Sequence, residues 1–318
     1  MKLALRAAAV TAAAEVASFT YQRIAETRDR RRYPPPGRLV DIGGRYLHLV
    51  TAGEGSPAVV IIPALADNVL VWLRALEGVA AETKTCVYDR AEVGWSDPLP
   101  RGRRTFDLMA SDLHALLSAA GIAPPYVLVG HSIGGIIARR FYAQHPDLVA
   151  GMVLVESSHE QQVSRFAAVD WTKGPAFYLT VMARRQTRIL GARRVAASLR
   201  LMRGLDADIA REVLPECADA ARAIMLSTRF QRAVVGEMLM VVRASGQPPG
   251  LGSIPLTVLS AARQAPRIGP TWAQMQDELA ALSTDSEHIT APEAGHYIHL
   301  DEPDLVIKAI RDLVRRCR

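Results

Sequence analysis

A serine framed by glycines is the residue in this chain best placed to do chemistry. Ser132 lies in the stretch Gly130–Gly135, where an apolar run ends and a helical pattern begins. This strand–turn–helix context is the one in which G-x-S-x-G exposes a serine hydroxyl above the edge of a sheet. Gly130 and Gly134 lack the Cβ atoms that would clash where strand and helix approach closely. The turn also puts the serine at a helix N-terminus, which favours a developing negative charge. We therefore predict that Ser132 is a nucleophile rather than part of a structural glycine turn.

A serine hydroxyl needs a base to take its proton, and the base needs an acid to orient it. His296 follows the last predicted strand, and Gly295 before it allows a turn that aims the imidazole across the strand ends. We predict that His296 is the base. His299 is its local competitor, but it lies where the chain enters the last helix, so we expect packing or hydrogen bonding there. His131 directly precedes the nucleophile, and we expect its ring to point away from Ser132, as a structural residue or a pocket wall.

The acid is predicted at the carboxyl end of a strand, where parallel sheets collect their reacting groups. Glu156 directly follows the predicted strand 151–155, and we choose it as the acid. The loop after strand 254–260 contains no carboxylate. Asp285 is the runner-up, although it precedes the last strand and should therefore lie at the opposite end of the sheet. The competing interpretation of Glu156 is a cap on the helix that follows.

Two backbone N–H groups near the serine must form the oxyanion hole. One is predicted to be that of Ile133, directly after the nucleophile. The other should come from the loop after strand 58–62. Leu65 is the preferred donor there and Ala64 the second choice, because Pro63 has no N–H group to offer.

Short apolar runs alternate with helical patterns along most of the chain, which predicts a parallel sheet covered on both faces. The expected strands are 39–42, 46–51, 58–62, 85–88, the run from Tyr126, 151–155, 254–260 and 287–290. The expected helices are 69–80, 105–119, the segment after Ser132, 272–282 and 303–314. The alternation stops between residues 159 and 246, where the pattern is helical and rich in arginine. We therefore expect a helical insertion between two strands of the sheet.

Composition places the chain among ordinary globular proteins. It has 318 residues, of which 49% are hydrophobic and 22% charged, and a net charge of +6. The three cysteines, Cys86, Cys217 and Cys317, lie far apart, so a disulfide framework is not expected. Cysteine and histidine do not recur at metal-ligand spacing, and we expect neither a metal nor a cofactor.

The N-terminal segment allows three interpretations. Residues 3–21 are rich in alanine and are short for a membrane span, and a basic run follows at residues 28–32. The segment could be a weak membrane anchor, a surface-bound amphipathic helix, or a helix packed on the body. These interpretations leave the location open between the cytoplasm and association with a membrane through residues 1–33. The stiff stretch Pro34–Gly37 then separates this segment from the folded domain.

From about Arg38 to the C-terminus the chain resembles the α/β-hydrolase superfamily. The resemblance is carried by Gly130–Gly135, by Tyr88–Asp97 and by Ala294–Ile298. It implies a mostly parallel central sheet flanked by helices, a Ser-His-acid triad, no metal or cofactor, and a mobile helical lid after the sixth strand. The implied domains are an N-terminal helix and Pro-rich linker (1–37), a hydrolase core (38–158 and 251–318) and the lid (159–250).

The chain departs from the common family pattern at three places. Many members have His-Gly where Pro63 and Ala64 stand, and many have glycine in place of Glu92. Many also carry an aspartate after the seventh strand, where this chain has Gln264. Members with the acid after the sixth strand exist, and Glu156 would be a longer variant of that arrangement.

The function expected from these features is hydrolysis of a carboxylic ester of a small or medium apolar substrate through an acyl-enzyme. Epoxide hydrolases and haloalkane dehalogenases of this fold use an aspartate nucleophile, which Ser132 argues against. The alternatives are C–C or amide-bond hydrolysis, a cofactor-free peroxidase-like reaction, or a non-catalytic binding protein on the same fold. The expected partner is the small-molecule ester and not a nucleic acid, and the sequence leaves the oligomeric state open.

Overall fold

A single mostly parallel sheet runs through the part of the chain that the structure describes. The computed structural model describes residues 2–99, 104–169, 194–195 and 212–318. Within these ranges eight strands are ordered β1-β2-β4-β3-β5-β6-β7-β8. They are β1 (Arg38–Asp41), β2 (Tyr46–Ala52), β3 (Ala58–Ile62), β4 (Thr85–Tyr88), β5 (Tyr126–His131), β6 (Val149–Val155), β7 (Leu256–Ala261) and β8 (Ser286–Ala291). Strand β2 pairs antiparallel with β1 and β4, and all other pairs are parallel.

Helices cover both faces of the sheet, which is why the central strands are apolar throughout. Strand β3 shows the division: Val59 and Ile61 belong to one core, and Val60 and Ile62 to the other. The first core is closed by α2 and α13, and the second by α3 and α4. These helices are α2 (Leu73–Ala80), α3 (Phe106–Ala119), α4 (Ile133–Gln144) and α13 (Pro303–Arg316). The predicted α/β class is therefore confirmed.

The predicted elements agree with the observed ones to within a few residues. Strands β3 and β4 have the predicted bounds, whereas β7 begins two residues later than predicted. The helix predicted from residue 69 begins as the 3-10 turn η1 (Val69–Trp72). The Asn68 side chain accepts from the backbone N–H of Leu70 and caps the start of this turn. Near the C-terminus α11 (Gly269–Ala280) and the one-turn helix α12 (Ile298–Asp301) complete the core.

The described part of the segment between β6 and β7 is mostly helical, with loops next to the two strands. It contains α5 (Gln162–Val169), η3 (Pro215–Cys217), α9 (Ala218–Met225) and α10 (Thr228–Val242). Much of the expected lid, residues 170–193 and 196–211, lies outside the described residues. The position of the insertion in the fold thus agrees with the sequence, while its role as a lid stays a prediction.

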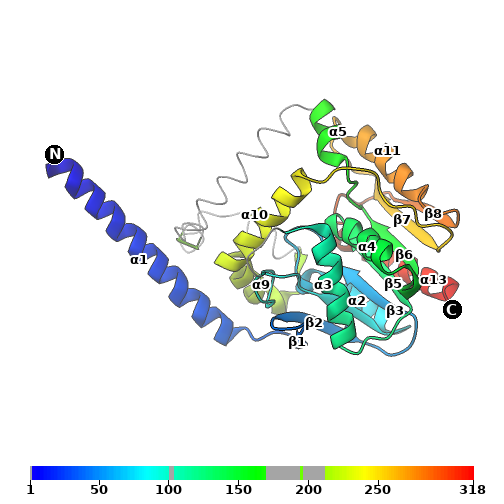
Figure 1. Cartoon of the computed structure of the whole chain (residues 1–318), viewed down its shortest axis with the longest axis horizontal. Helices are drawn as coiled ribbons and strands as arrows, with labels where there is room; N and C mark the ends of the chain where they lie inside the picture. Colours follow the sequence, from blue (N-terminus) through cyan, green and yellow to red (C-terminus); the bar gives the residue numbers. More distant parts are fainter. Residues whose placement is uncertain (1, 100–103, 170–193, 196–211) are drawn as a thin grey trace.

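The N-terminal segment forms one long helix, α1 (Lys2–Arg32), which ends just before the proline-rich break. Figure 1 shows α1 extending away from the body, with the N-terminus at its far end. Its second half is anchored: Gln22 Nε2 donates to the carbonyl of Leu226 at 2.9 Å, and Glu26 is buried and accepts from the backbone N–H of Thr228. Among the described helices, none combines the length and apolar character needed to cross a membrane.

Candidate active site

Ser132 occupies the turn between β5 and α4 in a backbone conformation that few non-glycine residues adopt. Its φ and ψ are 51° and −121°. The neighbouring glycines are needed for close approach: a Cβ on Gly130 would lie 2.6 Å from the Cα of Gly135, and one on Gly134 would lie 2.0 Å from the carbonyl oxygen of Ile62. The sequence Gly130–Gly135 therefore folds as the predicted sharp turn, and the strain concentrates at the serine.

His296 and Glu156 meet beyond the carboxyl ends of the strands. His296 Nδ1 lies 3.3 Å from Glu156 Oε2; the Glu156 side chain is completely buried, whereas that of His296 is 42% exposed. With Nδ1–H donating to the carboxylate, the Nε2 lone pair of a neutral ring is left to accept a proton. The structure thus brings together the two residues that the sequence predicted as base and acid.

Ser132 lies next to this pair without being bonded to it. Its Oγ is 3.4 Å from Ser158 Oγ, and in the described part of the chain no hydrogen bond joins it to His296. The serine turn and the histidine loop are joined through the residue before the serine. His131 Nε2 donates to the backbone carbonyl of His296 at 2.8 Å. Catalytic hydrogen bonds are often long or absent in ligand-free geometry and form only with substrate.

Three N–H groups besides that of His296 hold the Glu156 carboxylate. Oε1 accepts from the backbone N–H of Ala261 at 2.6 Å. Oε2 accepts from Trp272 Nε1 at 2.9 Å and from Gln264 Nε2 at 3.2 Å. Sequence reasoning missed both side chains, although Gln264 stands where many family members carry an aspartate. In this chain the Gln264 amide stands at that position and donates to Glu156, which follows the neighbouring strand β6.

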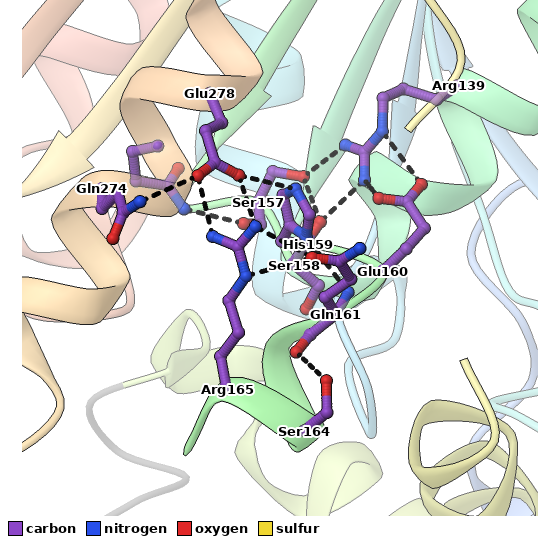
Figure 2. A network of polar contacts seen from close by, with 11 residues as sticks. Arg139, Ser157, Ser158, His159, Glu160, Gln161, Ser164, Arg165, Gln274 and Glu278 are labelled. Carbon is purple, nitrogen blue, oxygen red and sulfur yellow. Dashed lines mark hydrogen bonds and ion pairs between the residues drawn. The ribbon is translucent and has the colours of Figure 1, made fainter. Parts of the chain in front are cut away.

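The loop that follows Glu156 is fixed by a buried polar network (Figure 2). Arg139, on α4, is paired with Glu160 at 3.0 Å and donates to Ser157 Oγ at 2.9 Å and to the Ser158 carbonyl at 2.8 Å. Burial lowers the pKa of Arg139, and the ion pair with Glu160 opposes this shift. The backbone N–H of Ser158 also donates to the carbonyl of Ser132 at 2.9 Å. The network therefore ties the Ser158 hydroxyl to its place against the nucleophile.

A second buried network holds the loop predicted to supply an oxyanion donor. Arg90 donates to the carbonyls of Pro63 and Ala64, each at 2.6 Å, and pairs with Glu237 on α10 at 2.8 Å. This loop also begins beside the nucleophile turn, since the carbonyl of Pro63 would be 3.0 Å from a Cβ on Gly134. The functional assignment of the Leu65 and Ile133 N–H groups remains a prediction.

The other candidates for the site lie elsewhere or are inaccessible. Asp285 forms a half-exposed ion pair with Arg316 at 2.5 Å, at the start of β8 and away from His296. His131 is completely buried and packs inside the protein. His299 is also buried and stacks on Trp72, with ring centroids 3.9 Å apart.

Comparison with known proteins settles the family. A family model described as the alpha/beta hydrolase fold matches residues 57–212. The chain belongs to the α/β-hydrolase superfamily. Its sheet order and the serine turn between β5 and α4 agree with that assignment. The expected fold class is thereby confirmed together with the family.

Similar proteins span most of this α/β hydrolase. A protein of Gibberella zeae described as an AB hydrolase superfamily protein is 24% identical over 280 residues, covering 82% of this chain and 87% of its own. A thermophilic esterase from Thermogutta terrifontis matches with a TM-score of 0.58 and 22% identity, covering 86% and 94% of the two chains. The enol-lactonase from Burkholderia xenovorans matches with a TM-score of 0.61 and 17% identity, covering 87% and 100%. At these identities the structural similarity establishes the fold.

Proposed function

We propose that this α/β hydrolase cleaves a carboxylic ester of a small or medium apolar substrate through an acyl-enzyme on Ser132. The observation that carries the proposal is the strained turn at Ser132 next to His296, whose ring contacts the buried Glu156 carboxylate. A strained backbone conformation persists only where the surrounding structure enforces it. The similarity to an esterase and a lactonase supports the same class of reaction, acyl transfer to water.

The reaction begins with rotation of Ser132 Oγ from Ser158 toward His296 Nε2. The imidazole takes the hydroxyl proton as Oγ attacks the substrate carbonyl carbon. The N–H groups of Ile133 and Leu65 donate to the oxyanion that forms, and Glu156 stabilises the imidazolium. His296 then protonates the leaving alcohol. A water molecule, deprotonated by the same imidazole, hydrolyses the acyl-enzyme and restores the serine.

The identity of the nucleophile favours ester chemistry over the other hydrolytic reactions of this fold. Dehalogenases and epoxide hydrolases form an alkyl ester on a carboxylate, whereas position 132 carries a hydroxyl group. A hydroxyl nucleophile requires a base for its own activation, which His296 is placed to provide. The helical insertion between β6 and β7 is then proposed as the lid that shields the acyl group from solvent.

A fluorophosphonate probe tests the proposal directly, because it labels only an activated serine. Wild-type protein should be labelled, and labelling should disappear in Ser132→Ala and fall strongly in His296→Ala. Ser111→Ala, which removes a hydroxyl on the exposed side of α3, is the matched control and should label normally. Folded wild-type protein that resists the probe, or Ser132→Ala that is labelled equally, would refute the proposal. A series of p-nitrophenyl esters of increasing chain length then defines the acyl group.

A further inference from the structure

Three buried side chains from distant segments converge behind the candidate active site. Asp67 follows β3, His131 ends β5 and His299 lies in α12. Their relative exposures are 4%, 0% and 2%. One oxygen or nitrogen from each residue can be chosen so that all three atoms lie within 4.8 Å of one another. The cluster is separate from the Glu156–His296 pair but touches both the nucleophile turn and the histidine loop.

Several polar atoms of this cluster are buried without hydrogen-bond partners. Among the described residues, Asp67 Oδ2, His131 Nδ1 and both ring nitrogens of His299 are buried without one. The first two face each other at 3.5 Å. Buried polar atoms are almost always hydrogen-bonded, so four unsatisfied atoms at one place need an explanation. A ligand that accepts one lone pair from each side chain would satisfy three of the four.

The tautomer of His131 shows what kind of ligand is missing. Its Nε2 lies 2.8 Å from the backbone carbonyl of His296, which can only accept, so Nε2 carries the hydrogen. In the neutral ring, Nδ1 then presents a lone pair toward the carboxylate of Asp67. Two acceptors that face each other need either a proton or a metal ion between them. A metal ion would in addition bind a lone pair of His299, which a proton on His131 would leave unsatisfied. Histidines that bind metals typically donate their other ring N–H to a backbone carbonyl or carboxylate in this way.

We propose that Asp67, His131 and His299 bind a divalent first-row transition-metal ion such as Zn²⁺. Two imidazole nitrogens and one carboxylate oxygen form a ligand set that suits such ions, whereas Mg²⁺ and Ca²⁺ prefer oxygen ligands alone. Around a tetrahedral zinc ion the ligand atoms lie about 3.4 Å apart. Separations of up to 4.8 Å would therefore have to shorten by up to about 1.4 Å on binding. Water takes the fourth position.

Charge balance supports a cation at this place. Asp67 brings a buried negative charge, and the guanidinium of Arg90, which interacts with it electrostatically, is already paired with Glu237. A bound ion would tie the loop that carries Leu65, the Ser132 turn and the segment after His296 to one another. The expectation of no metal rested on ligand spacing along the sequence, and these ligands come from three distant segments.

Metal binding can be measured on tag-free, full-length protein that has been stripped with chelator. We expect calorimetric titration with Zn²⁺ to give one ion per chain and a rise in the melting temperature. Asp67→Asn and His299→Gln should each weaken Zn²⁺ binding by about 100-fold or more, since loss of an outer-shell partner alone costs about 10- to 100-fold. His288→Gln, which alters a histidine paired with Asp277 near the surface, is the matched control and should bind normally.

Two outcomes overturn the proposal: absence of stoichiometric Zn²⁺ binding, or binding that is unchanged in both ligand variants. Replacement by Co²⁺ gives an answer from the wild-type protein even if the variants fail to fold. Visible bands of cobalt held by nitrogen and oxygen ligands support the site. A sulfur-to-cobalt charge-transfer band assigns the ion to the cysteines instead, and absence of any protein-induced band overturns the proposal as well.

Discussion

Replacing Glu156 with glutamine tests the candidate site most sharply, because the carboxylate is surrounded by donors. Its Oε1 accepts from Ala261, and its Oε2 accepts from Trp272, Gln264 and His296. A glutamine amide has one oxygen and one NH₂ group. If the NH₂ group takes the place of Oε1, it faces the backbone N–H of Ala261. If it takes the place of Oε2, it faces the N–H groups of Trp272 and His296.

The expected losses follow from these contacts. Hydrogen bonds to a charged group are worth about 1.5–3 kcal/mol, and at least one buried donor is left facing another, so Glu156→Gln should lower the free energy of unfolding by about 3 kcal/mol. In a serine protease, replacing the triad acid by its amide lowers kcat by about 10⁴. We expect a fall of about 10³ to 10⁴ here, with KM changed little, because the buried Glu156 side chain lies behind His296 and away from any substrate.

The assay combines kcat and KM on p-nitrophenyl esters with urea unfolding of the same preparations. Glu293→Gln makes the same chemical change on an exposed side chain and should leave both quantities near wild type. If Glu156→Gln kept kcat within about threefold of wild type, the acid assignment would be wrong. If its activity fell while its stability stayed unchanged, the donor–donor conflict derived from the contacts would be wrong.

Two further predictions concern the turn and the pH dependence of stability. Gly134→Ala should abolish activity and lower the free energy of unfolding by about 1–3 kcal/mol or more, because its Cβ would lie 2.0 Å from the carbonyl oxygen of Ile62. Thermal unfolding measures this loss. Gly250→Ala is the control and should show no such loss, because its added Cβ would have nothing within 4 Å. Burial alone would lower the pKa of His48, but the hydrogen bond and charge of Asp89 outweigh it and raise the pKa. The stabilising contribution of protonated His48 is therefore complete below pH 6.5 and is lost as the pH rises through the folded-state pKa. Urea unfolding between about pH 6 and 9 should show wild type losing stability relative to His48→Gln, and a pH-independent difference would contradict this assignment.

The sequence was sufficient for the architecture because the physical signals are local. Short apolar runs such as 58–62 are typical of strands buried on both faces, and their alternation with helices implies a parallel sheet. In such a sheet the carboxyl ends of the strands share one edge. That is why Glu156 and His296 could be expected to meet, and their observed contact follows from topology rather than from any local pattern.

The supporting contacts could not be predicted, because they join residues whose positions depend on tertiary packing. Gln264 and Trp272 reach Glu156 because β7 pairs with β6 and α11 packs on β7. Arg90 meets Glu237 across 147 residues of sequence, and neither position carries a pattern that names its partner. The departure at Gln264 was a signal, but only the structure shows that a donor is needed there.

The ion pair between Arg90 and Glu237 joins the helical insertion to the hydrolase core. Both side chains are almost completely buried, and Arg90 simultaneously holds two carbonyls of the loop after β3. Separating α10 from the core would break this ion pair and expose Glu237 to solvent, while Arg90 would stay bonded to the two loop carbonyls. A movement that carried α10 away from the core would have to break the Arg90–Glu237 pair. For the same reason, a chimera that exchanges the insertion with that of another α/β hydrolase must carry residue 90 and the loop from Pro63 along with it.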